Sequence, residues 1–207
     1  MKGLLLKDLY LTVRYCRAFL ILEIVFLTVA FFGKANVFFI VYPTLVAGIL
    51  PMSLLSYDER DKWNQYCETL PCSRAQVVSV KYIIGLLFSG VTWLISMTAT
   101  VVRMVLFDSF SIRELLFWGE ILLVLGVIGP MLLLPFVFKL GVEKGRILFY
   151  VMIGLLCAIS VVVNSVGLQT TIASGNPLLL TIIAAAGILL YLLSWRLSIV
   201  FYKQREL

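Results

Sequence analysis

The chain has 207 residues, of which 62% are hydrophobic and 14% are charged, and its net charge is +6. Soluble domains carry about 25% charged residues, so this composition excludes an ordinary water-soluble domain. The sequence contains no histidine, which excludes Ser-His dyads and histidine-ligated metal sites.

Residues 1–16 predict an amphipathic helix that lies on the inner membrane surface ahead of the first membrane span. The side chains that share its apolar face are Leu5, Leu6, Leu9 and Val13. The cations that can extend toward lipid phosphates are Lys2, Lys7 and Arg14. The alternative is a frayed tail whose charges orient the first span.

Six apolar runs are long enough for membrane-spanning helices, which need about 20 residues. They cover residues 18–33, 36–56, 82–106, 115–138, 147–168 and 177–195. Backbone polar groups in lipid must be satisfied within the segment, and the runs lack the period-two alternation of a β-barrel. We therefore expect an all-α membrane protein in which residues 1–207 form a single domain with six transmembrane helices.

Ionisable and proline residues interrupt several of these runs. Because Glu23 interrupts the first run and no small-residue cleavage site follows, we expect a retained helix and not a signal peptide. An ionisable group at a span centre costs about 2.5–3.5 kcal/mol, so these polar residues are candidates for the substrate path: Glu23, Arg103, Glu120 and Asn164. Arg103 and Glu120 can alternatively pair with each other. Two explanations, moving cavities or simple packing, stay open for the prolines, which are Pro43, Pro51, Pro130 and Pro135.

The distribution of Lys and Arg predicts the orientation in the membrane. Fourteen of these residues lie in the N-terminal arm, in residues 57–81, in residues 139–146 and at the C-terminal end, and three lie elsewhere. We therefore expect a multi-pass protein of the cell membrane with both termini in the cytoplasm. The net charge then reflects topology and requires no nucleic-acid partner.

The four cysteines give no clear sign of a metal or disulfide. The topology places Cys16, Cys67 and Cys72 in the reducing cytoplasm and Cys157 in a span, so no disulfide is expected. Cys67 and Cys72 are too few for a zinc site, which usually has four ligands, and we expect no metal.

The most polar part of the chain is residues 57–74. Helical spacing there can bury Trp63, Tyr66 and Leu70 and expose the charged residues, which are Asp58, Glu59, Asp61 and Lys62. Pro71 would end this helix, and Ser73 can cap the helix that follows. The alternative is a solvated loop with an aromatic anchor at the lipid headgroups.

The sequence has no G-x-x-x-x-G-K-[ST] phosphate loop. We expect no enzymatic activity in this chain and no cofactor bound to it. A transport function would need an energy source on another subunit.

Three stretches resemble small ABC-2 type permeases of Gram-positive bacteria. The run from Asp58-Glu59 through Trp63, Tyr66, Leu70-Pro71, Ser73-Arg74 and Val77 to Lys81-Tyr82 is similar to the segment between spans two and three of that family. Residues 3–10 are similar to its N-terminal elbow helix, and residues 135–146 to its turn between spans four and five. The permeases of phenol-soluble-modulin exporters belong to this group.

The resemblance implies a permease subunit of an ABC exporter. Two copies of the chain would pair and bind two ATPase subunits, which carry ATP and Mg²⁺. Residues 1–16 would be the elbow helix, and residues 57–74 would contain a cytoplasmic coupling helix. The residues implied at the ATPase contact are Tyr57, Asp58, Glu59, Arg60, Asp61, Lys62, Trp63, Tyr66 and Leu70, with a second contact at Glu143, Lys144 and Arg146.

The many apolar residues of the spans favour an amphipathic peptide or another hydrophobic cargo, in contact with membrane lipids. The alternative function is a membrane immunity or sensor component that binds a toxic peptide without transporting it. A proton- or ion-linked carrier would need more buried carboxylates than the sequence offers.

Overall fold

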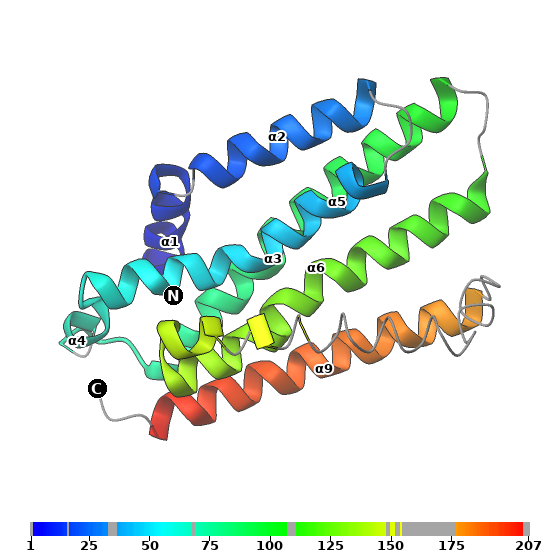
Figure 1. The fold of residues 1–207 in the computed structure, drawn as a ribbon. Helices are drawn as coiled ribbons and strands as arrows, with labels where there is room; N and C mark the ends of the chain where they lie inside the picture. The colour runs from blue at the N-terminus through cyan, green and yellow to red at the C-terminus, as the bar shows by residue number, and fades with distance from the viewer. Residues whose placement is uncertain are drawn as a thin grey trace.

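The computed structural model describes residues 2–15, 17–32, 37–67, 69–106, 111–147, 150–151, 154 and 177–204. Within this part of the chain every regular element is a helix, as the sequence predicts (Figure 1). The helices are α1 (Lys2–Tyr15), α2 (Arg17–Phe32), α3 (Val37–Arg60), α4 (Trp63–Cys67), α5 (Arg74–Leu106), α6 (Ile112–Leu140) and α9 (Pro177–Gln204).

Three of the described helices are long and apolar enough to cross a membrane. They are Arg74–Val105, Ile112–Leu140 and Thr181–Gln204, which correspond to the expected third, fourth and sixth spans. Helices α2 and α3 coincide with the first two expected spans, whereas the run 147–168 lies largely outside the described residues. A total of six spans therefore stays a prediction.

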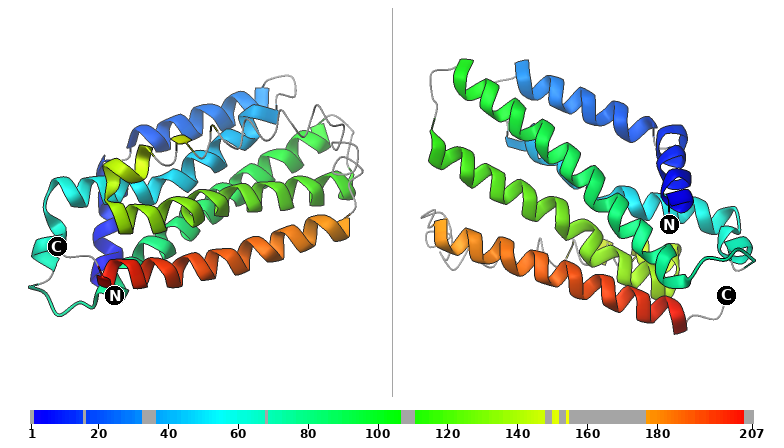
Figure 2. Two further views of the ribbon diagram at one scale, coloured as in Figure 1. Left: turned by 60° about the horizontal axis from the view of Figure 1, so that its bottom comes forward. Right: turned by 180° about the vertical axis from the view of Figure 1, so that it is seen from behind.

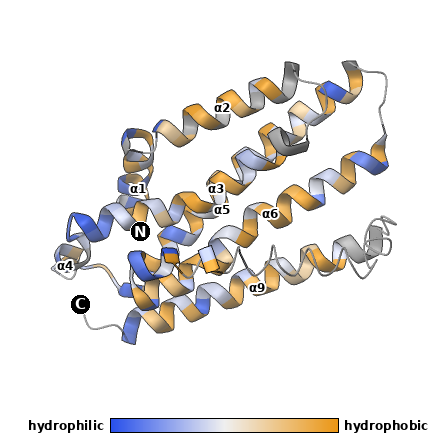
Figure 3. Cartoon of the chain, in the orientation of Figure 1, coloured by the Kyte–Doolittle hydropathy of each residue, from blue (hydrophilic) through white to orange (hydrophobic). Residues whose placement is uncertain are grey.

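The long helices lie side by side, and α1 lies across them at one end (Figures 1 and 2). This end also carries α4, the helical residues 142–147 and the C-terminal end of α9. Hydrophilic residues gather there, while the long helices are mostly apolar (Figure 3). The start of α1 and the end of α9 therefore share one end of the bundle.

Helices α3, α5 and α6 pack closely because small residues and prolines lie where they meet. A Cβ atom at Gly129 would lie 3.1 Å from the backbone of Gly48, and one at Gly85 would lie 3.0 Å from Pro51. Pro130 is buried in the same contact. These contacts favour packing over moving cavities for Pro51 and Pro130.

Helix α5 is joined to α9 by neutral hydrogen bonds. The Tyr82 hydroxyl lies 2.8 Å from the Ser194 hydroxyl and 2.6 Å from the Ser198 hydroxyl. The Tyr191 hydroxyl donates to the Tyr82 carbonyl at 2.8 Å, and the Trp195 ring stacks on the Tyr82 ring. We call these five residues the tyrosine–serine contact, which is not among the features predicted from the sequence.

Candidate functional site

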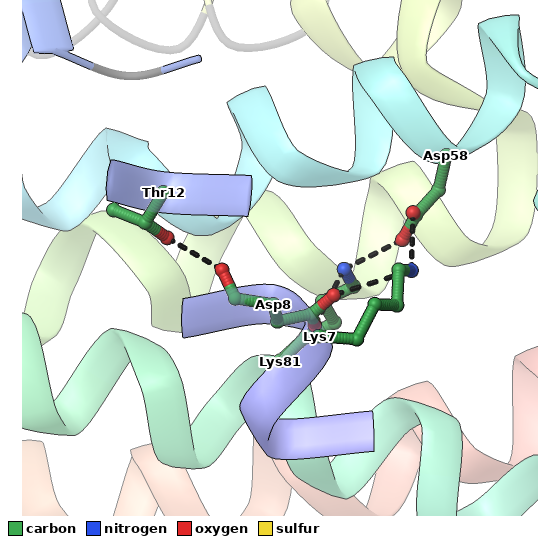
Figure 4. A network of polar contacts seen from close by, with 5 residues as sticks. All are labelled: Lys7, Asp8, Thr12, Asp58 and Lys81. Carbon is green, nitrogen blue, oxygen red and sulfur yellow. Dashed lines mark hydrogen bonds and ion pairs between the residues drawn. The ribbon is translucent and has the colours of Figure 1, made fainter. Parts of the chain in front are cut away.

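Four charged side chains from three helices meet at the end of the bundle that carries α4 (Figure 4). Lys81 on α5 lies 2.7 Å from Asp8 on α1 and 2.6 Å from Asp58 on α3. Lys7 on α1 lies 2.6 Å from Asp58 and 3.3 Å from Asp8. Each carboxylate therefore contacts both ammonium groups. We call Lys7, Asp8, Asp58 and Lys81 the charge cluster.

The charge cluster is almost dry. Lys81 is 1% exposed, Asp8 2% and Asp58 4%, while Lys7 keeps partial access to solvent. The space that they surround is about 10 Å³, enough for about one water at most. Two cations and two anions make the group neutral, which is the condition under which charges can be buried.

Helix α1 presents one face to the bundle and another outward. Leu4, Asp8 and Thr12 are buried and recur at four-residue steps, so they share a face. Leu6 and Val13 are exposed, and the placement of this apolar face on the membrane surface stays a prediction. Lys7, expected to reach lipid phosphates, instead binds Asp58.

The end of α3 differs from the sequence-based expectation. Residues 57–60 continue α3 and do not form a separate amphipathic helix. In this register Leu50, Leu54 and Asp58 share a buried face. The predicted exposure of Asp58 is therefore wrong, because its carboxylate is directed into the charge cluster.

A tight turn follows α3 and leads into α4. Lys62 adopts a left-handed conformation, with φ of 53°, and α4 spans only Trp63–Cys67. The Lys7 ammonium lies 4.0 Å from the centroid of the Trp63 ring, a distance at which cation–π attraction operates. Trp63 and Leu70 are half-buried, but the predicted burial of Tyr66 is wrong, since this ring is 58% exposed.

The two segments expected to contact a partner lie together in the structure. The Val142 backbone N–H donates to the Glu59 carboxylate at 2.9 Å. The Arg146 guanidinium lies 3.5 Å from the Ser56 hydroxyl. A Cβ atom at Gly145 would lie 2.7 Å from the Val137 side chain, so the lack of a side chain there lets residues 142–147 pack against the end of α6. The end of α3 and residues 142–147 thus form one surface.

Charged side chains on this surface point to solvent. Those exposed are Arg60, Asp61, Lys62, Glu143, Lys144 and Arg146. Tyr57 and Glu59 are half-buried. The Arg60–Asp61 pair is loose, at 3.9 Å, so these two groups remain accessible to a partner. We call the six exposed residues the charged end surface.

The protein-family model described as ABC-2 family transporter protein matches residues 3–203 of the chain. The chain belongs to this family. No curated protein matches the chain, and no solved structure matches it. Membership makes the chain a membrane component of an ABC transporter that acts with an ABC ATPase.

The helix that follows the polar segment of this ABC-2 chain begins as predicted. The Gln76 backbone N–H donates to the Ser73 hydroxyl at 3.2 Å, and the Ser73 N–H donates to the Gln76 side chain at 3.1 Å. This reciprocal pair is a capping box. The predicted cap at Ser73 is confirmed, and Arg74 next to it donates to the Lys203 carbonyl at the end of α9.

Two of the four expected intramembrane polar residues, Arg103 and Glu120, have described side chains, and these two are not paired. Arg103 and Glu120 are both half-buried, and among the described residues no ion pair joins them. Arg103 lies near the end of α5, whereas Glu120 lies about two turns into α6, which places them at different depths. The side chain of Glu23 and all of Asn164 lie outside the described residues.

The two described cysteines are free thiols, Cys67 and Cys72. In the described part of the chain no three potential ligands gather in a way that could hold a metal. Burial raises the pKa of the Cys67 thiol, and the neighbouring Cys72 raises it further. Cys67 is therefore held in its neutral form.

Asp8 and Lys81 belong to the charge cluster but are not among the site residues predicted from the sequence. The apolar runs place Lys81 in the loop before the third span, whereas α5 begins at Arg74 and contains it. The available signal was helical phase: Val77, Lys81 and Ile84 are all buried and lie on one face. A charge in phase with an apolar stripe indicates a buried ion pair.

Proposed function

We propose that this chain is the permease subunit of an ABC exporter and that its charged end surface is where two cytoplasmic ATPase subunits dock. The observation that carries the proposal is the bond from the Val142 N–H to Glu59. It joins the two segments that carry the exposed charges into one surface at the end where positive charges concentrate. The excess of Lys and Arg at this end supports a cytoplasmic location for it.

The site would work as a contact and not as a catalyst. Exposed charges at the rim of an interface govern encounter and specificity, and the exposed Tyr66 offers an aromatic anchor of the type enriched in binding hot spots. ATP would act through the partner: closing of the ATPase dimer would shift the permease between two states for which it has different affinity. Two copies of the chain would enclose the path between them.

The class of cargo is inferred from the side chains that the membrane helices expose. The exposed parts of α2, α5 and α9 are mostly large aliphatic residues, which favours an amphipathic peptide or another hydrophobic molecule. Arg103 and Glu120, together with Glu23 and Asn164, remain candidates for polar contacts along this path.

A charge-reversal experiment tests the docking surface. The pair Arg60→Glu/Asp61→Lys reverses two adjacent exposed charges at this end. The matched control Arg113→Glu/Glu114→Lys reverses two adjacent exposed residues at the opposite end of the bundle. Both variants keep the net charge unchanged.

We expect the first variant to bind the ABC ATPase about tenfold more weakly or worse, which corresponds to about 1.4 kcal/mol. The control should bind as the wild type does. Co-purification from detergent extracts, followed by titration, measures this. Equal binding of both variants would reject the docking surface and would favour the immunity or sensor function, which needs no ATPase contact.

A liposome assay tests the cargo class. The reconstituted complex should hydrolyse ATP faster when a synthetic amphipathic helical peptide is added, and a scrambled peptide of equal composition should have no such effect. Equal rates with both peptides would remove amphipathic peptides as cargo.

A further inference from the structure

We propose that Lys81 is a positioning residue that, through Asp8 and Asp58, makes α1, the end of α3 and the start of α5 move as one body. The proposal rests on the docking function above. It adds the route by which a displacement at the charged end surface would reach a long membrane helix.

The route begins at Trp63 in the segment that follows α3. Its ring lies beneath the Lys7 ammonium, and Lys7 in turn binds Asp58 at 2.6 Å. Asp58 and Asp8 both bind Lys81, which belongs to α5. Each of these contacts joins residues on different helices. Only Lys7 and Asp8, which also contact each other, are neighbours on the same helix, α1.

The arrangement resists sliding of one helix past another. Lys81 contacts carboxylates from α1 and α3 simultaneously, so moving either helix lengthens one of two short ion pairs. Because Lys81, Asp8 and Asp58 are buried and the space between them holds about one water at most, water replaces a lost partner poorly. Apolar contacts, by contrast, have no direction and tolerate small shifts.

Two variants separate positioning from simple stability. Lys81→Met leaves the cluster with an unpaired negative charge, which is strongly destabilising when buried. The double variant Asp8→Asn/Lys81→Met keeps Lys7 and Asp58 as a neutral pair, a change that buried ion pairs often tolerate. The double variant should fold, yet α5 is no longer tied to α1 by charge.

Spin labels report the tie directly. Labels are placed at Tyr10→Cys on α1 and Leu86→Cys on α5, both exposed positions, in a chain whose four cysteines are replaced by alanine. The distance distribution is measured by pulsed electron paramagnetic resonance for the labelled parent, for the double variant and for a control that carries Lys139→Met, an exposed lysine at the same end.

In the permease alone we expect one narrow distance peak for the parent and the control, and a broader or second peak for the double variant. In the complex with the ATPase, the parent peak should keep its position when Mg-ATP is trapped with vanadate. A double variant as narrow as the parent would overturn the proposal, and so would a parent peak that shifts with nucleotide. Because the first measurement needs no ATPase, its result is independent of whether the docking function holds.

Discussion

Two adjacent residues of α5 hold the bundle in different ways. Lys81 faces α1 and α3 through ion pairs, whereas Tyr82 faces α9 through hydroxyl groups and ring stacking. Both side chains are almost fully buried. One helix therefore combines a charged tie, the charge cluster, with a neutral tie, the tyrosine–serine contact. We expect the charged tie to fail when one member is lost and the neutral tie to weaken in steps.

The largest difference should come from removing one charge. Lys81→Met should lower the free energy of unfolding by about 3–5 kcal/mol, because the buried carboxylates of Asp8 and Asp58 then share Lys7, which is partly exposed, as their one cation. Thermal unfolding in detergent measures the change, with Lys139→Met as the control. A loss no larger than that of the control would mean that the charge cluster is solvated, and the contrast with Tyr82 would disappear.

We expect an intermediate loss of stability from loosening the close contact between α3 and α6, which belongs to neither tie. Gly129→Ala places a Cβ atom 3.1 Å from the Gly48 backbone, which should cost about 1–3 kcal/mol through overpacking. Gly187→Ala is the matched control, because no atom of the described residues lies within 4 Å of its added atom. If the two variants unfold at the same temperature, the close packing at Gly129 contributes no more to stability than the environment of Gly187 does.

The neutral tie should respond least. Tyr82→Phe removes the bonds to Ser194 and Ser198 but keeps the stack on Trp195. Interhelical hydrogen bonds in membranes average about 0.6 kcal/mol, with a maximum of about 1.7, so the unfolding midpoint should fall only slightly. A loss as large as that of Lys81→Met would show that the two ties are equivalent and would remove the distinction.

Local signals in the sequence were sufficient to predict the positions of most described helices. Apolar run length predicted the positions of the long helices, and the Ser73 cap depended only on residues three apart. The extension of α3 through Arg60 was not predicted, because the charged residues there suggested a break. Helical phase would have corrected it, since Asp58 continues the buried face of Leu54.

The partners in the charge cluster could not be predicted in the same way. Which carboxylate meets Lys81 depends on how far α1, α3 and α5 slide along each other, and that register is set by side chains far apart in the chain. The same holds for Glu59, whose partner is a backbone N–H at Val142. Every residue except proline has a backbone N–H, so the residue type does not reveal which N–H will bind a side chain.

The crosswise placement of α1 has a consequence for biosynthesis. Chains emerge from the ribosome N-terminus first, so α1 is made before α3 and α5. Lys7 can bind Asp58 only after a further 51 residues have been made. Asp8 can bind Lys81 only after the beginning of α5 has been translated. Lys81 is the last member of the charge cluster to be made, so the buried carboxylates can be fully neutralised only after residue 81 has been translated.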